Sequence, residues 1–469
     1  MKNNLLLSNS TWRNLIFIAI PIMLYLQFMH LGSAIDYYII GSKVNSTHNI
    51  IAAITYLKQI KKILSSIAMA LSSAGIVLVT SEYKSKNQTK ARQYAALSFL
   101  LSLIISIILV LIFYLCTWLP EGFDFCLKKT ERSDGGLEYY NLSLLTFIFI
   151  TINMVFFSLE RIKNKTKFIL FLNITNILIR IFLSFVCKFL FKETVSLIHL
   201  AYADLLANLF ISLVAIYFMF FNKKNEFKFQ FKGLILSKQI AIKMLKLSSI
   251  LVLGNSSYVI GKHLINNMII DLYQEQGRMV LAMSGLAAVV NGIFYVISQS
   301  FEDAQISMIS QNLAIGKHGK LNFKIFKNTL WITFIIGIFG IFLNIFMGRK
   351  LLQLIKPDIN VNKEELRYFQ IVLNFEQFSL FTSIWASLIM GYIFAHTHKA
   401  NIFLFLNMLR ILIRIFLIRF LWWNQKILSI YIQYGLSTLF SNIIILILAI
   451  VMLFKFVNKM SKVSCFSEK

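Results

Sequence analysis

The sequence contains little charge, little proline and little cysteine, and each shortage excludes a class of protein. Charged residues make up 14% of the 469 residues, whereas a soluble domain is about 25% charged. A soluble globular protein is therefore excluded. Only three prolines are present, so long helices can run without interruption. The four cysteines form no CxxC pair and no zinc-type spacing, which argues against a structural metal site.

Two further shortages concern catalysis. The sequence has no Walker-type phosphate loop, so an ATP-driven pump is not expected. The seven histidines are dispersed along the chain. An integral-membrane enzyme, such as an acyl or glycosyl transferase, needs a nucleophile or acid/base set that converges, and the sequence offers none. We therefore expect that the protein is not an enzyme and that it needs no cofactor.

Long apolar segments dominate what the sequence does contain. Hydrophobic residues make up 58% of the chain, and the mean hydropathy is +0.71. A helix needs about 20 mostly apolar residues to cross a bilayer, and twelve segments meet this requirement. They are 14–40, 50–79, 93–118, 139–160, 167–190, 196–221, 242–270, 279–309, 325–347, 367–395, 400–423 and 428–456. The sequence thus predicts an all-α polytopic membrane protein with twelve transmembrane helices.

One seven-residue string occurs twice in the chain. Ile177–Leu183 and Ile411–Leu417 are identical and lie at an offset of 234 residues. Each predicted repeat contains six helices, an even number, so both copies enter the membrane in the same sense and the repeat is parallel. We therefore predict two pseudo-symmetric six-helix lobes. Their boundaries are 1–222 for the N-terminal lobe, 223–241 for a cytoplasmic linker and 242–469 for the C-terminal lobe.

The strong basicity is explained by the loops. The formal net charge is +27. When the N-terminus is placed inside, most loop Lys and Arg residues fall on the inner side, as the positive-inside rule requires. We predict a multi-pass protein of the plasma (cell) membrane with both termini in the cytoplasm and with basic loops that contact anionic lipids of the bilayer. Nucleic acid is not needed to explain the charge, and a monomer suffices.

Several short motifs resemble those of one known family. The motif residues are Pro21, Gly32, Asp36 and Gly41 in the first segment, Asn173 and Asn176 in the fifth, and Gln311–Gly316 after the eighth. Together with the six-plus-six layout, they resemble the MATE (multidrug and toxic compound extrusion) family of the MOP flippase superfamily. The resemblance implies a secondary active antiporter that exports organic, often cationic and amphiphilic, drugs or toxins by alternating access. It also implies that Asp36 binds the coupling ion, which is H+ or Na+.

Ionisable side chains within the membrane carry the hypothesis about the coupling site, because such groups are costly there. Many members of the resembled family have Asn-x-x-x-Asp in the fifth helix, where this chain has Asn176-x-x-x-Arg180. A buried guanidinium needs carboxylate partners, and Asp36 and Asp204 lie at a similar depth. We predict a cation-coupling cluster of Asp36, Asp204, Arg180 and Asn176, in which Arg180 takes the place of a bound cation. Alternatively, Arg180 is a structural lock.

The charge of this cluster bears on the coupling ion. One arginine and two aspartates would give a net charge of −1 and leave one carboxylate free to take a proton. This charge favours proton coupling over sodium coupling.

The second half of the chain repeats the pattern with different residues. Arg414 is the repeat mate of Arg180, Glu376 is the nearest acid by estimated depth, and Lys262 falls roughly where Asp36 lies in the first half. With Asn173, these residues are the predicted substrate-binding set. This half has more cations than acids at mid-membrane, so its charges are either structural or meet an anionic group. The alternative function is therefore a flippase or exporter of a lipid-linked or anionic substrate.

Overall fold

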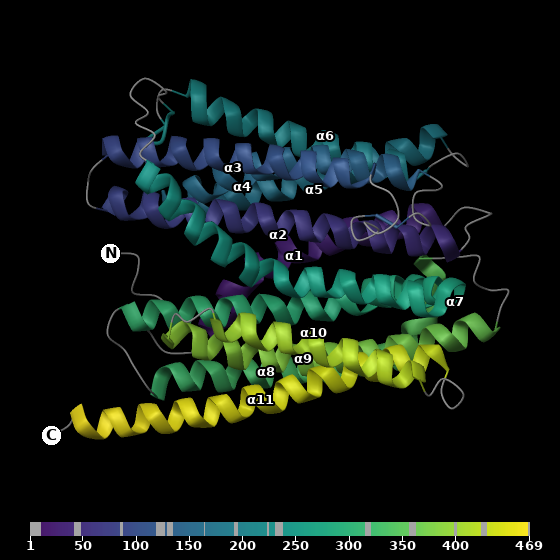
Figure 1. The fold of residues 1–469 in the computed structure, drawn as a ribbon. Helices are drawn as coiled ribbons and strands as arrows, with labels where there is room; N and C mark the ends of the chain where they lie inside the picture. Colours follow the sequence, from purple (N-terminus) through teal and green to yellow (C-terminus); the bar gives the residue numbers. More distant parts are fainter. Residues whose placement is uncertain are drawn as a thin grey trace. The chain divides into compact units, whose positions relative to one another are not determined.

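The structure is a computed structural model in which the regular elements of the described residues are all helices (Figure 1). The described residues are 11–41, 48–84, 88–118, 127–128, 135–163, 165–191, 196–222, 225–229, 238–314, 320–355, 363–397, 401–423 and 429–467. The helices are α1 (Thr11–Gly41), α2 (His48–Lys84), α3 (Gln88–Cys116), α4 (Gly136–Ile162), α5 (Thr166–Phe191), α6 (Leu197–Ile216), the π-helix η4 (Tyr217–Phe221), α7 (Lys238–Ala314), α8 (Lys320–Ile355), α9 (Lys363–Thr397), α10 (Asn401–Trp423) and α11 (Ile430–Ser467). The predicted all-α class is confirmed.

A break inside α7 accounts for the predicted number of segments. Gln274 has φ 49° and ψ −120°, which no helical residue adopts, so the 77-residue α7 consists of two helices. These two helices contain the predicted segments 242–270 and 279–309. Nine of the ten other predicted segments each correspond to one helix, and segment 196–221 covers α6 and η4; the ends differ by up to eleven residues, most at the end of α11.

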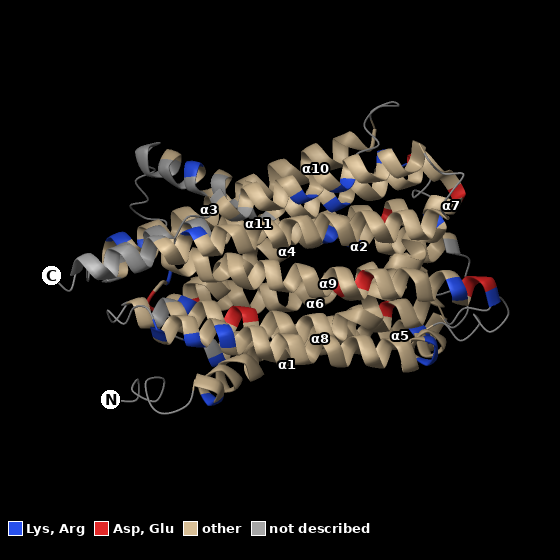
Figure 2. Cartoon of the chain, turned by 90° about the horizontal axis from the view of Figure 1, so that it is seen from below, with Lys and Arg blue, Asp and Glu red and all other residues tan. Residues whose placement is uncertain are grey.

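Most of these helices have the composition of membrane spans. Within the described residues, nine helical stretches are long and apolar enough to cross a bilayer, and one of them, Ser256–Ile309, runs through the break in α7. Figure 2 shows that Lys, Arg, Asp and Glu gather mainly at the ends of the helices, with long uncharged stretches between them. Pro21 lies inside α1, where it removes one backbone hydrogen bond; membrane helices tolerate such a loss.

The helices form two compact units, each of which is described by itself. The first, here called the N-unit, comprises Ile35–Asp271, and the second, the C-unit, comprises Met1–Ala34 together with Leu272–Lys469. Both α1 and α7 are therefore divided between the units. The predicted lobe boundaries, 1–222 and 242–469, follow the duplication of the sequence and not these compact units. As boundaries of the duplicated halves they stay a prediction. Residues 223–224 and 230–237 of the predicted linker lie outside the described residues.

Small side chains allow close packing of helices in the N-unit. α3 packs against α2 and α4, and it buries Ala91, Ala95, Ser98, Ser102 and Ser106. These residues recur every three or four positions and thus form one face of the helix. Between membrane helices, close contact of small residues contributes much of the packing energy, because lipid is as apolar as the protein interior.

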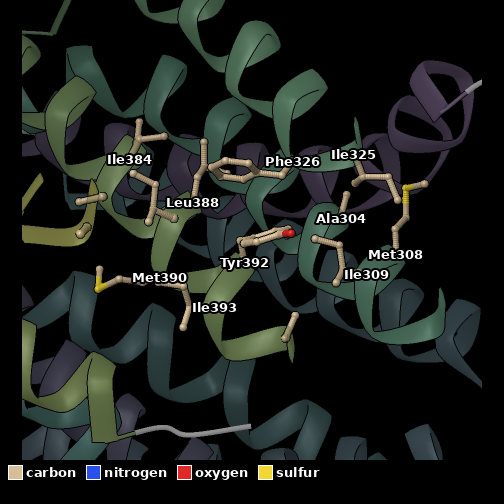
Figure 3. Packing of buried hydrophobic residues seen from close by; sticks show 14 of the residues in the cluster. Ala304, Met308, Ile309, Ile325, Phe326, Ile384, Leu388, Met390, Tyr392 and Ile393 are labelled. Atoms are coloured by element: carbon tan, nitrogen blue, oxygen red, sulfur yellow. The ribbon is translucent and has the colours of Figure 1, made fainter. Parts of the chain in front are cut away.

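The C-unit has its own buried apolar cluster, contributed by α1, α7, α8, α9, α10 and α11 (Figure 3). The aromatic ring of Phe326 on α8 packs against Tyr392 on α9, with ring centroids 4.8 Å apart. α9 is the centre of this unit, since it contacts α8, α10 and α11.

Candidate functional site

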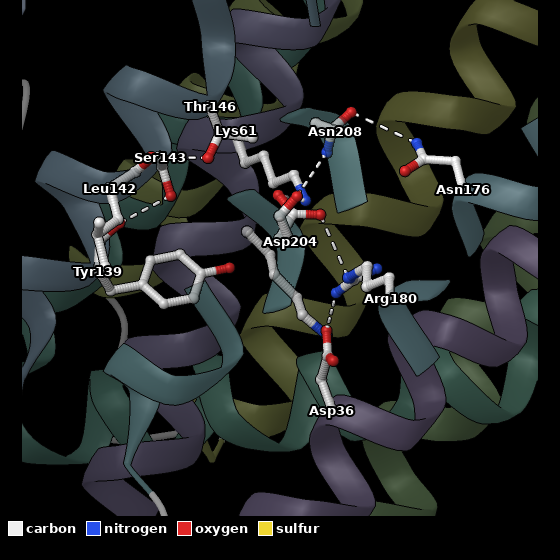
Figure 4. Close-up of polar contacts among 11 residues, drawn as sticks. Asp36, Lys61, Tyr139, Leu142, Ser143, Thr146, Asn176, Arg180, Asp204 and Asn208 are labelled. Carbon is white, nitrogen blue, oxygen red and sulfur yellow. Dashed lines mark hydrogen bonds and ion pairs between the residues drawn. The ribbon is translucent and has the colours of Figure 1, made fainter. Parts of the chain in front are cut away.

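Five charged side chains meet in the interior of the N-unit (Figure 4). They come from four helices: Asp36 from α1, Lys58 and Lys61 from α2, Arg180 from α5 and Asp204 from α6. We call them the charge cluster. The two lysines are three residues apart, and such residues lie on one face of a helix. The cluster lies within apolar helices, and its two acids are more deeply buried than its three cations.

Arg180 joins the two carboxylates. Its Nη2 donates a hydrogen bond to Oδ2 of Asp36, and its Nε lies 3.2 Å from Oδ1 of Asp204. Both acids are buried, with 2% of Asp36 and 6% of Asp204 exposed. The predicted contact of Arg180 with both carboxylates is therefore present.

The lysines of α2 complete the cluster. Lys58 Nζ lies 3.1 Å from Oδ2 of Asp36, the same oxygen that Arg180 contacts. This ammonium also lies over the ring of Tyr37, 4.1 Å from its centroid. Lys61 Nζ lies 2.5 Å from Oδ2 of Asp204. Each carboxylate is thus shared by a lysine and the arginine.

These lysines change the predicted charge of the site. Three cations and two carboxylates give a formal net charge of +1, so the predicted net charge of −1 is wrong, and so is the prediction of a free carboxylate. The lysines were not predicted to belong to the cluster, because apolar runs locate helices but not the partners of a charge. One sequence signal could have found them: two lysines on one face of an apolar helix need acids opposite.

The predicted asparagines differ in their relation to the cluster. Asn176 Nδ2 lies 3.4 Å from Oδ1 of Asn208, whose own Nδ2 donates to the backbone carbonyl of Asp204. Asn176 thus reaches the charge cluster through Asn208. Asn173 donates to the carbonyl of Ile169 within its own helix, so this contact does not bring it into the cluster.

Tyr139 of α4 closes one side of the cluster. Its side chain is buried, with 3% exposed, and Figure 4 shows its ring directed toward Asp204 and its neighbours. Ser143, one turn further along α4, donates to the backbone carbonyl of Tyr139.

A second polar network lies in the C-unit. Ser284 Oγ donates to Oε1 of Glu376 at 2.7 Å, and the hydroxyl of Tyr434 lies 2.8 Å from the same Oγ. The guanidinium of Arg414 lies over the ring of Tyr434, 5.0 Å from the centroid. The structure therefore links Glu376 and Arg414 through Tyr434, without a direct ion pair between them among the described contacts. Arg410, one turn before Arg414, donates to Ser383 at 3.1 Å.

The predicted substrate-binding residues divide between the units. Asn173 and Lys262 belong to the N-unit, and Glu376 and Arg414 belong to the C-unit. Lys262 is half-buried on α7, next to His263, whose Nε2 lies 3.5 Å from the hydroxyl of Tyr56. Their role in binding stays a prediction, as does the role of the charge cluster in coupling.

No group of three or more His, Cys, Asp or Glu residues that could hold a metal ion exists within the part of the chain that the structure describes.

A further buried ion pair lies at the end of α4. Lys163 contacts Glu160, and its Nζ donates to Oδ1 of Asn225 at 2.8 Å. Burial lowers the pKa of Lys163, although Glu160 acts in the opposite direction.

Comparisons with known proteins agree with this architecture. Residues 21–186 match the MatE family model. An inward-facing multidrug resistance MATE family transporter of the MOP superfamily is 13% identical, with a TM-score of 0.75 over 96% of this chain and 99% of that chain. An outward-facing transporter of the same description is 15% identical, with a TM-score of 0.72 over 98% and 99% of the two chains.

A third solved structure is a MOP superfamily transporter from Pyrococcus furiosus, described by a binding pocket of reverse polarity that suggests a different function. It is 16% identical, with a TM-score of 0.68 over 97% of this chain and 98% of that chain. No curated protein matches the sequence. At these identities the solved structures establish the fold, and they do so over nearly the full length of each chain.

Proposed function

We propose that this chain, a multi-pass membrane transporter with a MatE domain and the fold of the MATE transporters, is a proton-coupled antiporter. It exports organic amphiphilic compounds across the plasma membrane by alternating access, as a monomer with both termini in the cytoplasm. In this proposal transport requires the coupling ion and the substrate, and no cofactor. The observation that carries the proposal is the charge cluster of the N-unit.

The cluster favours protons over sodium ions. Sodium is a hard cation and needs oxygen ligands, as other hard cations do. Both carboxylates of the cluster are already in contact with nitrogen cations, and the cluster has an excess of one positive charge. A further cation would increase that excess in a medium that disfavours unpaired charge. Loss of a proton from one lysine would remove the excess positive charge.

Lys58 is the group that releases the proton in this proposal. It shares Oδ2 of Asp36 with Arg180, so Asp36 keeps a cationic partner when the Lys58 ammonium becomes a neutral amine. Asp204 meanwhile keeps Lys61 at 2.5 Å. The products are a free proton and a cluster with no net charge. Arginine cannot take this role, because its guanidinium stays protonated.

The proton step can act on helix α1. Asp36 is the second residue after Ala34, where α1 passes from the C-unit to the N-unit. A change in the ion pairs of Asp36 thus changes how firmly one part of α1 is held by the N-unit. In the proposed cycle, loading and release of the Lys58 proton biases which face of the transporter opens.

The charge of the substrate has two candidates. The family resemblance favours a cationic amphiphile, and Glu376 is a buried acid of the C-unit. An anionic or lipid-linked compound is the second candidate, and one observation favours it: the buried Arg414 has no ion-pair partner among the described residues.

Transport in proteoliposomes tests the coupling proposal. We expect an imposed proton gradient, and not an imposed sodium gradient, to drive accumulation by the wild type of one of two labelled probes, ethidium or an anionic amphiphile. Lys58→Arg keeps the charge but cannot release the proton, so it should lose accumulation against a gradient yet retain exchange of labelled for unlabelled substrate. Arg419→Gln removes an exposed charge from α10 and serves as the control.

Two results would contradict the coupling proposal. One is accumulation that follows the sodium gradient. The other is proton-driven accumulation by Lys58→Arg at the rate of the wild type.

A further inference from the structure

The two copies of the repeated string place an arginine at the same point of each half, but the acid that pairs with it is present in only one. Arg180 and Arg414 are related by the offset of 234 residues. At the same offset, Asn208 of α6 corresponds to Asn442 of α11, which shows that the register holds on these helices. Asp204 then corresponds to Thr438. The C-unit therefore has a hydroxyl where the N-unit has a carboxylate.

Thr438 lies one helical turn from Tyr434, the residue that contacts Arg414. Its hydroxyl donates to the backbone carbonyl of Tyr434 at 2.9 Å, one turn earlier on α11. Tyr434 is the residue whose ring the Arg414 guanidinium faces. The face of α11 that approaches the arginine thus carries Tyr434 and Thr438 and no acid.

Within the part of the chain that the structure describes, Arg414 is buried without a counter-charge. Only 7% of the residue is exposed, and its Nε and Nη2 have no hydrogen-bond partner among the described residues. The contact with the Tyr434 ring is a cation–π interaction at 5.0 Å. Glu376 accepts a hydrogen bond from Ser284, and because Ser284 donates there, Tyr434 is the donor to Ser284.

The cation–π contact stabilises Arg414 by less than the desolvation of its guanidinium destabilises it. A cation–π contact stabilises a buried cation by less than the penalty for taking an ion out of water, even after the protein relaxes. Arginine cannot avoid the penalty by losing its proton. An intramembrane arginine with free donors is therefore best stabilised by an anion that comes from outside the chain.

We infer that Arg414 binds the acidic oxygen group, carboxylate or phosphate, of an amphiphile that the transporter moves. The inference rests on the proposed transport function and names the substrate class. Nε and Nη2 are adjacent on the guanidinium fork and present two parallel donors, the arrangement that carboxylates and phosphates accept in a bidentate manner. The ring of Tyr434 holds the guanidinium from one side, so the anion occupies the plane of the fork.

Binding to the purified full chain in neutral detergent tests the inference without any ion gradient. The probes are inorganic phosphate and hexyl phosphate, with hexanol as the uncharged control, and nanodiscs with or without phosphatidylglycerol. Calorimetry gives the affinity, and the unfolding temperature gives an independent measure. Arg419→Gln, which removes an exposed arginine from the same helix, is the matched control.

Two variants should remove the site in opposite ways. Arg414→Gln deletes the donor, so we expect the affinity for hexyl phosphate to fall at least tenfold. Thr438→Asp restores the acid of the repeat, so the new carboxylate should raise the unfolding temperature without ligand and abolish the further increase that hexyl phosphate causes. If Thr438→Asp does not fold, Arg414→Gln and Arg419→Gln still decide the question.

The probes distinguish the source of the anion. Stabilisation by hexyl phosphate assigns a free amphiphile, and stabilisation confined to phosphatidylglycerol nanodiscs assigns a lipid headgroup; either result supports the anion site if Arg414→Gln loses it. No stabilisation of the wild type by any probe, or equal stabilisation of Arg414→Gln, would overturn the inference. Lys58→Arg, which alters coupling, should bind the probes normally, so failure of one proposal is distinguishable from failure of the other.

Discussion

Replacement of Asp204 by asparagine should destabilise the protein strongly, because it removes one of only two negative charges in the charge cluster. Asp204 lies 2.5 Å from Lys61 Nζ and 3.2 Å from Arg180 Nε. Asp204→Asn keeps the size of the side chain and leaves three cations with Asp36 alone. The formal charge of the cluster rises from +1 to +2.

The expected loss is about 3–5 kcal/mol, the range for removal of one partner from a buried ion pair. The structure supports this range. Two unit charges at the 3.2 Å distance of Arg180 and Asp204 attract each other by about 5 kcal/mol at an effective dielectric constant of about 20. The loss of hydration of the carboxylate offsets part of this attraction in the wild type.

A second replacement should reverse most of the loss. Lys61→Met removes the cation that Asp204→Asn leaves without its acid, so the double variant again has a net charge of +1. We expect the double variant to lie within about 2 kcal/mol of the wild type, which makes the two replacements strongly non-additive. Unfolding in mixed detergent micelles, followed by circular dichroism and tryptophan fluorescence, measures all four proteins.

The control is Glu275→Gln. Glu275 is exposed on α7, so its loss should change stability by no more than about 1 kcal/mol. If Asp204→Asn is no less stable than Glu275→Gln, or if Lys61→Met adds to the loss instead of reversing it, then the charge cluster does not balance its charges as described.

Further predictions concern the packing and the end of α4. Glu160→Gln should destabilise the protein by about 3–5 kcal/mol, because it leaves the buried Lys163 without its acid. Burial lowers the pKa of Lys163 in the folded protein. Above that lowered pKa the unfolded chain therefore binds more protons than the folded one, and the stability of the variant should rise with pH toward about 10. A pH series of unfolding titrations checks this, and a pH-independent loss would contradict it. Gly435→Ala should cost about 1–3 kcal/mol, since its Cβ would come within 2.4 Å of the Phe375 side chain. Thermal unfolding measures the loss, and a thermally neutral variant would show that α9 and α11 are less closely packed.

The sequence predicted the helices and the arginine bridge for identifiable reasons. Apolar runs of about 20 residues depend only on local composition, so the segments of α4 and α5 were found to within a few residues. The duplicated string drew attention to Arg180, and electrostatics required an acid beside it, which led to Asp36 and Asp204. Both contacts are present in the structure.

The sequence could not provide the rest of the site because partners lie on other helices. Lys58 and Lys61 belong to the charge cluster only because α2 passes beside α1 and α6, which depth along one helix does not reveal. Similarly, Tyr434 and Ser284, which link Arg414 to Glu376, are 150 residues apart.

The division of α1 and α7 between the two units has a consequence for split expression. A cut in the connection between η4 and α7 would yield one polypeptide that lacks residues 238–271 of the N-unit and another that lacks residues 1–34 of the C-unit. Neither polypeptide can complete its compact unit alone. Activity of the split protein would thus require each fragment to supply a helical segment to the unit of the other. The two fragments would have to be co-expressed in the same membrane.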